Sequence, residues 1–137
     1  MEIFRWFSEN KDWVTIPLRI TLAILFIVGG AGKLFGTFGG PGLEGFSGML
    51  ANSGFPAAMF FAALVAVVEL LGGIALLIGF LTRYASVLLS IIMIVAILSM
   101  HLTGGYQLAL TALGGTLALL FAGAGPLSVD AKRSKGF

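Results

Sequence analysis

The chain has 137 residues, of which 58% are hydrophobic and 10% are charged, and its formal net charge is +2 at pH 7. Soluble domains carry roughly 25% charged residues, so this composition excludes a soluble protein and, with a mean hydropathy of +1.06, indicates a polytopic membrane protein with one small domain. The lack of cysteine excludes disulfides and thiolate metal sites within the chain, and a single histidine cannot form a metal site alone. The few lysines and arginines form no stripe that would suit nucleic acid.

Residues 1–15 mix charged side chains with tryptophans and phenylalanines. Such aromatic side chains favour the lipid headgroup region, so we expect an interfacial N-terminal arm with helical character. A poorly ordered tail with an aromatic anchor is the alternative. Residues 16–34 follow as the first apolar span, with Pro17 acceptable in its opening turn. A cleaved signal peptide is the other interpretation of this run, and we expect a retained span instead.

One face of the first span carries a cation near each end. Arg19 and Lys33 are fourteen residues apart in the sequence, so roughly four helical turns separate them and they lie on nearly the same face. Between them on that face lie Ala23, Phe26 and Gly30. We expect this stripe, which contains small residues, to pack against another helix.

Residues 35–55 are rich in glycine and form an expected outer loop. Three of the glycines match G-x-G-x-x-G by spacing, at Gly40, Gly42 and Gly45. They do not indicate a nucleotide site, because no strand–turn–helix pattern surrounds them. Apolar side chains at helical spacing follow, namely Leu43, Phe46, Met49 and Leu50. We therefore expect a short amphipathic helix on the membrane surface or a re-entrant lid, with a flexible loop as the alternative.

The second apolar span, residues 56–81, carries one carboxylate, Glu69, near its middle. An ionised side chain within the hydrocarbon region costs at least about 2.5 kcal/mol, so it must face protein, water or a partner charge. Steps of three and four residues place it in a stripe that is mostly small: Ala62, Ala66, Glu69, Gly72, Gly73, Leu76 and Gly79. Because small stripes let helix backbones approach closely, we expect Glu69 to face the interior of a helix bundle.

Two further apolar spans are expected at residues 84–101 and 106–122, with short turns before each. The third span has a mildly polar face formed by Ser86, Ser90, Met93, Ile97 and His101. The fourth span has a small and polar face formed by Gln107, Thr111, Gly114, Gly115, Ala118 and Ala122. Residues 124–137 form an expected basic tail.

These spans predict an all-α fold, an antiparallel bundle of four transmembrane helices over residues 16–123. The distribution of cations predicts its orientation. Seven of the eight lysines and arginines lie at the termini, at Arg19 or at the turn that contains Arg83, and Lys33 alone lies on the opposite side. The positive-inside rule therefore places both termini in the cytoplasm and the outer loop outside.

Four segments carry a resemblance to a known family: LRI around Arg19, LFIVGGAGKL ending at Lys33-Leu34, VELLGGIALLIGFLTR from Val68 to Arg83, and GPLSVD from Gly125 to Asp130. The sequence resembles the DoxX family of small four-helix membrane proteins from about Leu18 to Asp130. The resemblance implies a multi-pass protein of the prokaryotic inner membrane, associated with quinone-linked sulfur oxidation. DoxX-like proteins are associated with thiosulfate:quinone oxidoreductase and with a terminal quinol oxidase complex as membrane subunits, so the resemblance implies a role of this kind. It does not fix a catalytic residue. The polar positions that match are Arg19, Lys33, Glu69 and Arg83.

Glu69 is expected to find its nearest cation in Arg19, with Lys33 farther away. A structural ion pair that fixes helix register and a ligand-facing carboxylate that carries a proton are both open interpretations. Three outer-face residues, Lys33, His101 and Gln107, are further candidates. Lys33 has two interpretations: it binds a ligand, which is an anion or a quinone carbonyl, or its side chain extends to the membrane interface without a ligand. His101 is either a capping residue or a catalytic one.

The remaining residues singled out are structural. Arg83 is expected to fix topology and to contact lipid phosphate, and Gly72 and Gly73 allow close helix packing.

We expect the protein to be a membrane subunit of a quinone-linked redox assembly, with quinone as a bound cofactor. The chain lacks residues for an iron–sulfur cluster or a doubly ligated haem, so a redox partner subunit is expected as the electron source. A non-enzymatic lipid-binding, anchoring or assembly protein is the alternative, and a small transporter working as a homo-oligomer ranks third.

Overall fold

The computed structural model describes residues 1–99 and 106–133, and within these ranges it contains helices and no strand. The elements in chain order are α1 (Glu2–Glu9), the short 3-10 helix η1 (Lys11–Val14), α2 (Thr15–Phe35), η2 (Thr37–Gly39), α3 (Gly42–Asn52), α4 (Ala58–Ile78), α5 (Thr82–Ser99), α6 (Tyr106–Ala122) and α7 (Val129–Arg133).

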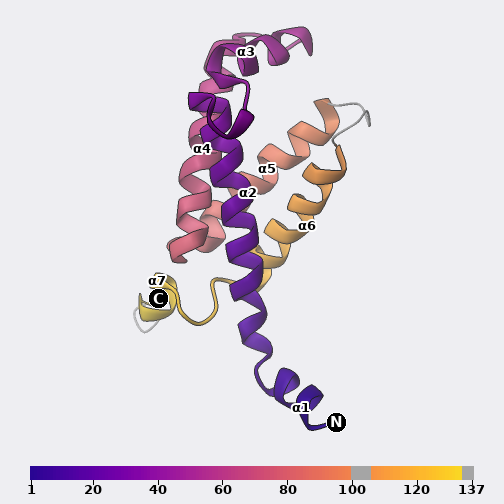
Figure 1. Cartoon of the computed structure of the whole chain (residues 1–137), viewed down its shortest axis with the longest axis vertical. Coiled ribbons are helices and arrows are strands. Elements are labelled where there is room, and N and C mark those ends of the chain that lie inside the picture. The colour runs from indigo at the N-terminus through magenta and orange to yellow at the C-terminus, as the bar shows by residue number, and fades with distance from the viewer. Residues whose placement is uncertain (100–105, 134–137) are drawn as a thin grey trace.

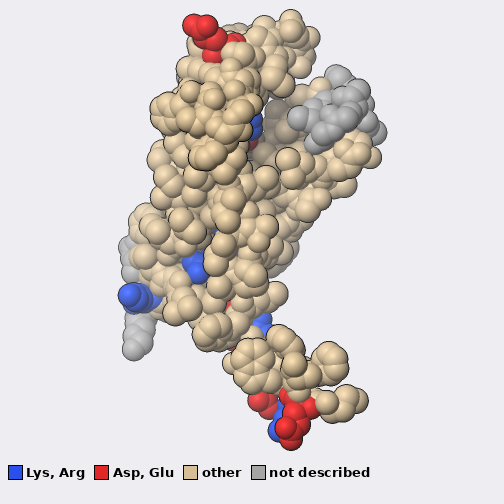
Figure 2. Space-filling view, viewed as in Figure 1, with Lys and Arg blue, Asp and Glu red and all other residues tan. Residues whose placement is uncertain are grey.

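The long helices form two antiparallel pairs, α2 with α4 and α5 with α6, as Figure 1 shows. Helix α3 lies across the upper end of the first pair, whereas α1 and α7 lie at the lower end. The two pairs meet near the α4–α5 turn, and α5 and α6 then lean away from α2 toward the upper end. Charged side chains gather mostly near the two ends, and much of the surface between them is uncharged (Figure 2).

Three helical stretches are long and apolar enough to cross a membrane by length and composition: Lys11–Phe35, Ala58–Ile78 and Thr82–Ser99. Helix α6 is apolar but has 17 residues. A span needs about 20 residues to cross the roughly 30 Å of hydrocarbon, so α6 is short for this role. The fourth span and the orientation of the termini therefore stay predictions.

The expected boundaries of the middle spans are wrong by two or three residues. The second span was expected over 56–81, but α4 ends at Ile78 because Gly79 takes a left-handed conformation (φ 72°) and caps the helix. Leu81 also has a positive φ of 48°, and α5 then begins at Thr82 rather than at residue 84. The turn thus lies between the two left-handed residues, a conformation that hydrophobic periodicity cannot reveal.

The two small-residue stripes expected on the first and second spans form the contact between α2 and α4. Ala23 and Ala66 are completely buried there. A Cβ added to Gly30 would lie 2.6 Å from the backbone N of Leu70, and one added to Gly73 would lie 2.9 Å from the backbone N of Ile27. Only glycine allows this approach, so these positions set how closely the two helices pack.

The small and polar face noted on the fourth span lies mostly on the outside of α6. Gln107, Thr111, Gly114, Ala118 and Ala122 are exposed, and Gly115 is half-buried. The buried residues of α6 are instead Ala109, Ala112, Thr116 and Leu119. Small residues occur around the whole helix, so spacing alone could not choose a face. On the buried face, Ser90 Oγ of α5 donates a hydrogen bond of 2.8 Å to Thr116 Oγ1 in the core.

The segment after α6 folds back onto the α4–α5 turn instead of forming only a basic tail. The Asp130 carboxylate accepts hydrogen bonds from the backbone N–H groups of Leu81 and Thr82, both at 2.8 Å. The backbone N–H of Asp130 donates to the carbonyl of Gly79 at 2.8 Å. Asp130 therefore caps the first turn of α5, and we call this set of three bonds the tail clasp.

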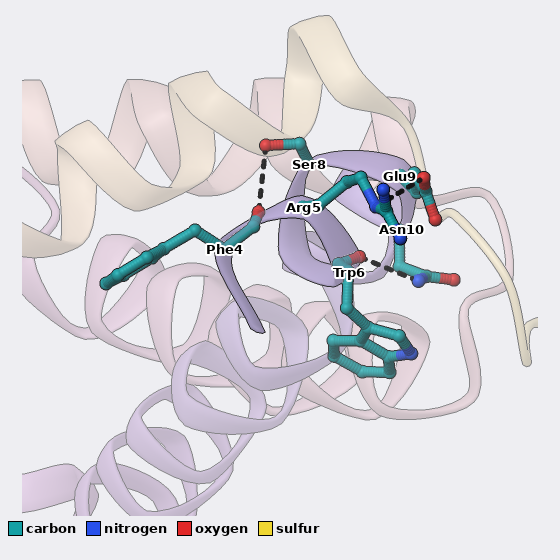
Figure 3. A network of polar contacts seen from close by, with 6 residues as sticks. All are labelled: Phe4, Arg5, Trp6, Ser8, Glu9 and Asn10. Atoms are coloured by element: carbon teal, nitrogen blue, oxygen red, sulfur yellow. Dashed lines mark hydrogen bonds and ion pairs between the residues drawn. The ribbon is translucent and has the colours of Figure 1, made fainter. Parts of the chain in front are cut away.

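The N-terminal arm is helical, and its polar groups bond to one another (Figure 3). Arg5 pairs with Glu9 at 3.7 Å, Ser8 donates to the carbonyl of Phe4, and the Asn10 side chain donates to the carbonyl of Trp6. Figure 3 shows the rings of Phe4 and Trp6 extending away from this network. No residue of α1 is buried, so its aromatic side chains are free to enter a lipid interface.

Candidate functional site

A buried ion pair joins the α2–α4 pair near its upper end. Lys33 Nζ of α2 lies 2.6 Å from Glu69 Oε2 of α4. The Glu69 side chain is 3% exposed and that of Lys33 is 26% exposed. The carboxylate is thus enclosed by protein, as expected, but its partner is Lys33 and not Arg19.

The direction of side chains on a helix explains why Lys33 and not Arg19 is the partner. Every Cα–Cβ bond tilts toward the N-terminus of its own helix. Because α2 and α4 run antiparallel, Lys33 leans down from the upper end and Glu69 leans up toward it. Arg19 leans away from Glu69, toward the lower end. Counting helical rise alone, as in the sequence prediction, omits this tilt.

Glycine makes room for the carboxylate on the facing helix. A Cβ at Gly29, one turn before Lys33, would lie 3.4 Å from Glu69 Oε2. Gly73, one turn after Glu69, is buried against Phe26 and Ile27. A Cβ added at Gly72 would lie 3.1 Å from the side chain of Leu89 on α5. Gly30 and Gly73 allow the close approach of α2 and α4 beside the ion pair, whereas Gly72 packs against α5.

Helix α3 places an aromatic ring over the lysine. Lys33 Nζ lies 5.3 Å from the centre of the Phe46 ring, within the range of a cation–π contact. The spacing of apolar residues predicted α3, but it did not single out Phe46 as a site residue. The signal available was an aromatic residue within an amphipathic helix in the loop that follows Lys33. Phe46 is half-buried, so α3 partly covers the ion pair.

Arg19 forms a separate polar centre at the lower end. It lies fourteen residues before Lys33, or about 21 Å along α2. Its side chain is 3% exposed, and Nη2 donates to the carbonyl of Leu127 at 2.9 Å. Nε and Nη1 are buried without a hydrogen-bond partner among the described residues. Arg19 therefore ties α2 to the segment that leads into the tail clasp.

Two of the remaining candidates, Gln107 and Arg83, do not join the ion pair. Gln107 is exposed on α6, and His101 lies outside the described residues. Arg83 donates to the carbonyls of Leu120 and Phe121 at 3.2 and 3.4 Å, so it caps the end of α6, a contact that the sequence did not predict. Within residues 1–99 and 106–133, no group of three metal-ligating side chains is present.

The chemistry available at the pair follows from its charges. A lysine ammonium has three N–H donors, and Glu69 accepts one of them. The remaining donors can bind a carbonyl or an anion that approaches from the exposed side of Lys33. The proton available to such a ligand is on the Lys33 ammonium, and the neighbouring Glu69 carboxylate stabilises that ammonium.

Comparison with known proteins shows to which family the chain belongs. The model of the DoxX family matches residues 14–102, which is more than half of the sequence. The chain belongs to the DoxX family. It is therefore a membrane protein, and Lys33, Phe46 and Glu69 all lie within the matched segment.

One curated relative of this DoxX protein is "Putative oxidoreductase CatD" from Bacillus subtilis (strain 168). The two are 29% identical over 100 residues, which cover 73% of this chain and 69% of the relative. No solved structure matches the DoxX chain significantly.

Proposed function

We propose that this DoxX protein is a membrane subunit of a quinone-linked redox assembly, and that the Lys33–Glu69 pair binds the quinone headgroup. The observation that carries the proposal is the 2.6 Å ion pair, buried on the carboxylate side and open on the lysine side. The oxidoreductase name of the Bacillus relative and the resemblance to quinone-linked DoxX proteins support the same class.

The residues act in complementary ways in this proposal. The exposed side of Lys33 donates a hydrogen bond to a quinone carbonyl, and Phe46 offers an aromatic face beside it. Reduction of a quinone to a quinol takes up two electrons and two protons. The Lys33 ammonium can give one of these protons to the quinone oxygen, and Glu69, which accepts a hydrogen bond from Lys33, favours return of the proton to the lysine from water. The second proton also comes from water.

Electrons enter from a redox partner subunit, because the chain has no cysteine for an iron–sulfur cluster. By resemblance, a sulfur compound is the proposed donor to that partner. In the proposed topology both termini lie in the cytoplasm of a prokaryotic cell, and the Lys33–Glu69 pair lies in the outer half of the inner membrane.

The test is quantification of quinone in protein purified in mild detergent from its native membrane. Wild type should retain quinone, whereas Lys33→Met and Glu69→Gln should lose most of it. Glu44→Gln changes an exposed carboxylate of α3 and should retain the wild-type amount. The proposal fails if wild type carries no quinone and Glu69→Gln leaves quinone reduction by membranes unchanged.

One observation favours the alternative function, a non-enzymatic assembly or anchoring protein. The exposed face of α6 carries Gln107, Thr111, Gly114 and Ala118, and nothing lies within 4 Å of a Cβ added at Gly114. Small and polar faces of this kind associate with other helices in membranes. In this alternative Gly114→Leu lowers the yield of oligomers in native mass spectrometry, while Glu69→Gln affects stability and no turnover.

A further inference from the structure

A second candidate site lies at the opposite end of the molecule from the Lys33–Glu69 pair. A cavity of about 780 Å³ opens between η1, the first turn of α5 and the segment that follows α6. This volume falls within the roughly 300–1,000 Å³ typical of small-ligand sites. Three apolar helices begin or end beside it, α2 at Thr15, α5 at Thr82 and α6 at Ala122. The cavity therefore lies where the hydrocarbon region gives way to lipid headgroups.

The acidic side chains around the cavity differ in whether they already have a hydrogen-bond or ion-pair partner in the protein. Both carboxylate oxygens of Asp130 accept backbone hydrogen bonds in the tail clasp. Glu9 pairs with Arg5. The Asp12 carboxylate has no hydrogen bond or ion pair with any part of the chain that the structure describes. Asp12 is thus the acid that remains available to a ligand.

The cationic side chains around the cavity have N–H donors that make no hydrogen bond to the described residues. Arg83 uses Nε and Nη2 to bond to the end of α6, and a guanidinium has five N–H donors. The Lys11 ammonium makes no hydrogen bond or ion pair within residues 1–99 and 106–133. The cavity therefore offers two positive groups and one negative group, a pattern that matches a zwitterion better than a simple anion.

Aromatic side chains complete the lining. Trp13 is 50% exposed and Tyr84 is 72% exposed, and both line the cavity. Tryptophan and tyrosine are enriched at membrane interfaces because their rings are apolar while one edge bears a hydrogen-bond donor. Their position supports a ligand that belongs to the membrane rather than to the aqueous phase.

We propose that this cavity binds the headgroup of a glycerophospholipid that carries a primary ammonium. Arg83 and Lys11 bind its phosphate, Asp12 binds its ammonium, and Trp13 and Tyr84 lie at the level of its glycerol. The lipid then joins the N-terminal arm to the α4–α5 turn. This site is independent of quinone and of the proposed redox function.

The experiment uses the full chain with Trp6→Phe, which leaves Trp13 as the single tryptophan. Short-chain phosphatidylethanolamine, phosphatidylcholine, phosphatidylglycerol and inorganic phosphate are titrated separately in detergent. Trp13 fluorescence and lipid adducts in native mass spectrometry report binding. The ethanolamine lipid should bind about fivefold more tightly than the glycerol lipid, which has no ammonium to form the partly exposed charge pair with Asp12. It should also bind more tightly than the choline lipid, whose methylated ammonium has no N–H to donate to Asp12, and more tightly than phosphate.

Asp12→Asn tests the contact that distinguishes the headgroups. Its carboxylate has no partner among the described residues, so the variant should fold normally, and it should remove the fivefold preference for the ethanolamine lipid. Glu44→Gln, at the other end of the molecule, should preserve it. Equal or tighter binding of phosphatidylcholine, phosphatidylglycerol or free phosphate would overturn the proposal, as would an unchanged preference in Asp12→Asn.

Discussion

Removing either member of the buried ion pair should destabilise the protein by unequal amounts. Lys33→Met leaves the Glu69 carboxylate, whose side chain is 3% exposed, without a partner. Breaking a buried pair in this way costs about 3–5 kcal/mol in the free energy of unfolding. Glu69→Gln leaves a lysine that is already 26% exposed and can turn toward water, so the expected cost is about 1–2 kcal/mol.

Reversible unfolding in mixed detergent micelles, followed by circular dichroism, measures both values. The thermal midpoint of Lys33→Met should fall by roughly 10–15 °C and that of Glu69→Gln by a third of this. The double variant Lys33→Met/Glu69→Met replaces both charges with apolar side chains and should recover to within about 2 kcal/mol of wild type. Lys132→Met removes an exposed lysine and serves as the control.

The asymmetry follows mainly from the burial of the two partners, and loss of the Phe46 contact in Lys33→Met adds to it. Equal losses for the two single variants, or a larger loss for Glu69→Gln, would refute the assignment of the carboxylate as the enclosed partner. A double variant as unstable as Lys33→Met would show that the destabilisation comes from lost packing and not from an unpaired charge.

Three further predictions concern the packing, the clasp and the topology. Gly30→Ala should destabilise the protein by about 1–3 kcal/mol, because its Cβ would lie 2.6 Å from a backbone atom of α4, whereas Gly114→Ala meets nothing within 4 Å and should be neutral or stabilising in the same unfolding assay. Asp130→Ala should cost about 0.5–2 kcal/mol and speed amide hydrogen exchange at Leu81 and Thr82, whose N–H groups it caps; unchanged exchange there would contradict the cap. A fluorescent protein fused after α7 should be fluorescent and alkaline phosphatase fused there inactive, since the C-terminal side is predicted to be cytoplasmic; active phosphatase would reverse the topology.

The periodicity of small residues indicated a face of α2 and a face of α4 that allow close helix packing, but it did not predict that these two faces contact each other. The same reasoning chose no packing face for α6, where alanine, glycine and threonine occur around the whole helix. The buried face of α6 includes Thr116, which accepts a hydrogen bond from Ser90 on another helix. A partner on a different element leaves no periodic trace in the sequence of α6.

The site was predicted in part. The sequence indicated that Glu69 is buried, since a carboxylate within an apolar span needs an enclosed position. The identity of its partner required the tilt of side chains on antiparallel helices, and the role of Phe46 required the position of α3 over α2. Arg83 and Asp130 act as caps of elements far away in the sequence, and such contacts are set by the tertiary fold alone.

The tail clasp also imposes an order on biogenesis. Asp130 lies 48 residues after Thr82, so the ribosome completes α5 and α6 before it adds the residue that caps α5. Until Asp130 has been added, the backbone N–H groups of Leu81 and Thr82 at the α4–α5 turn lack their cap. The tail clasp can form only after the segment that contains Asp130 has been synthesised. It therefore stabilises the turn late in folding.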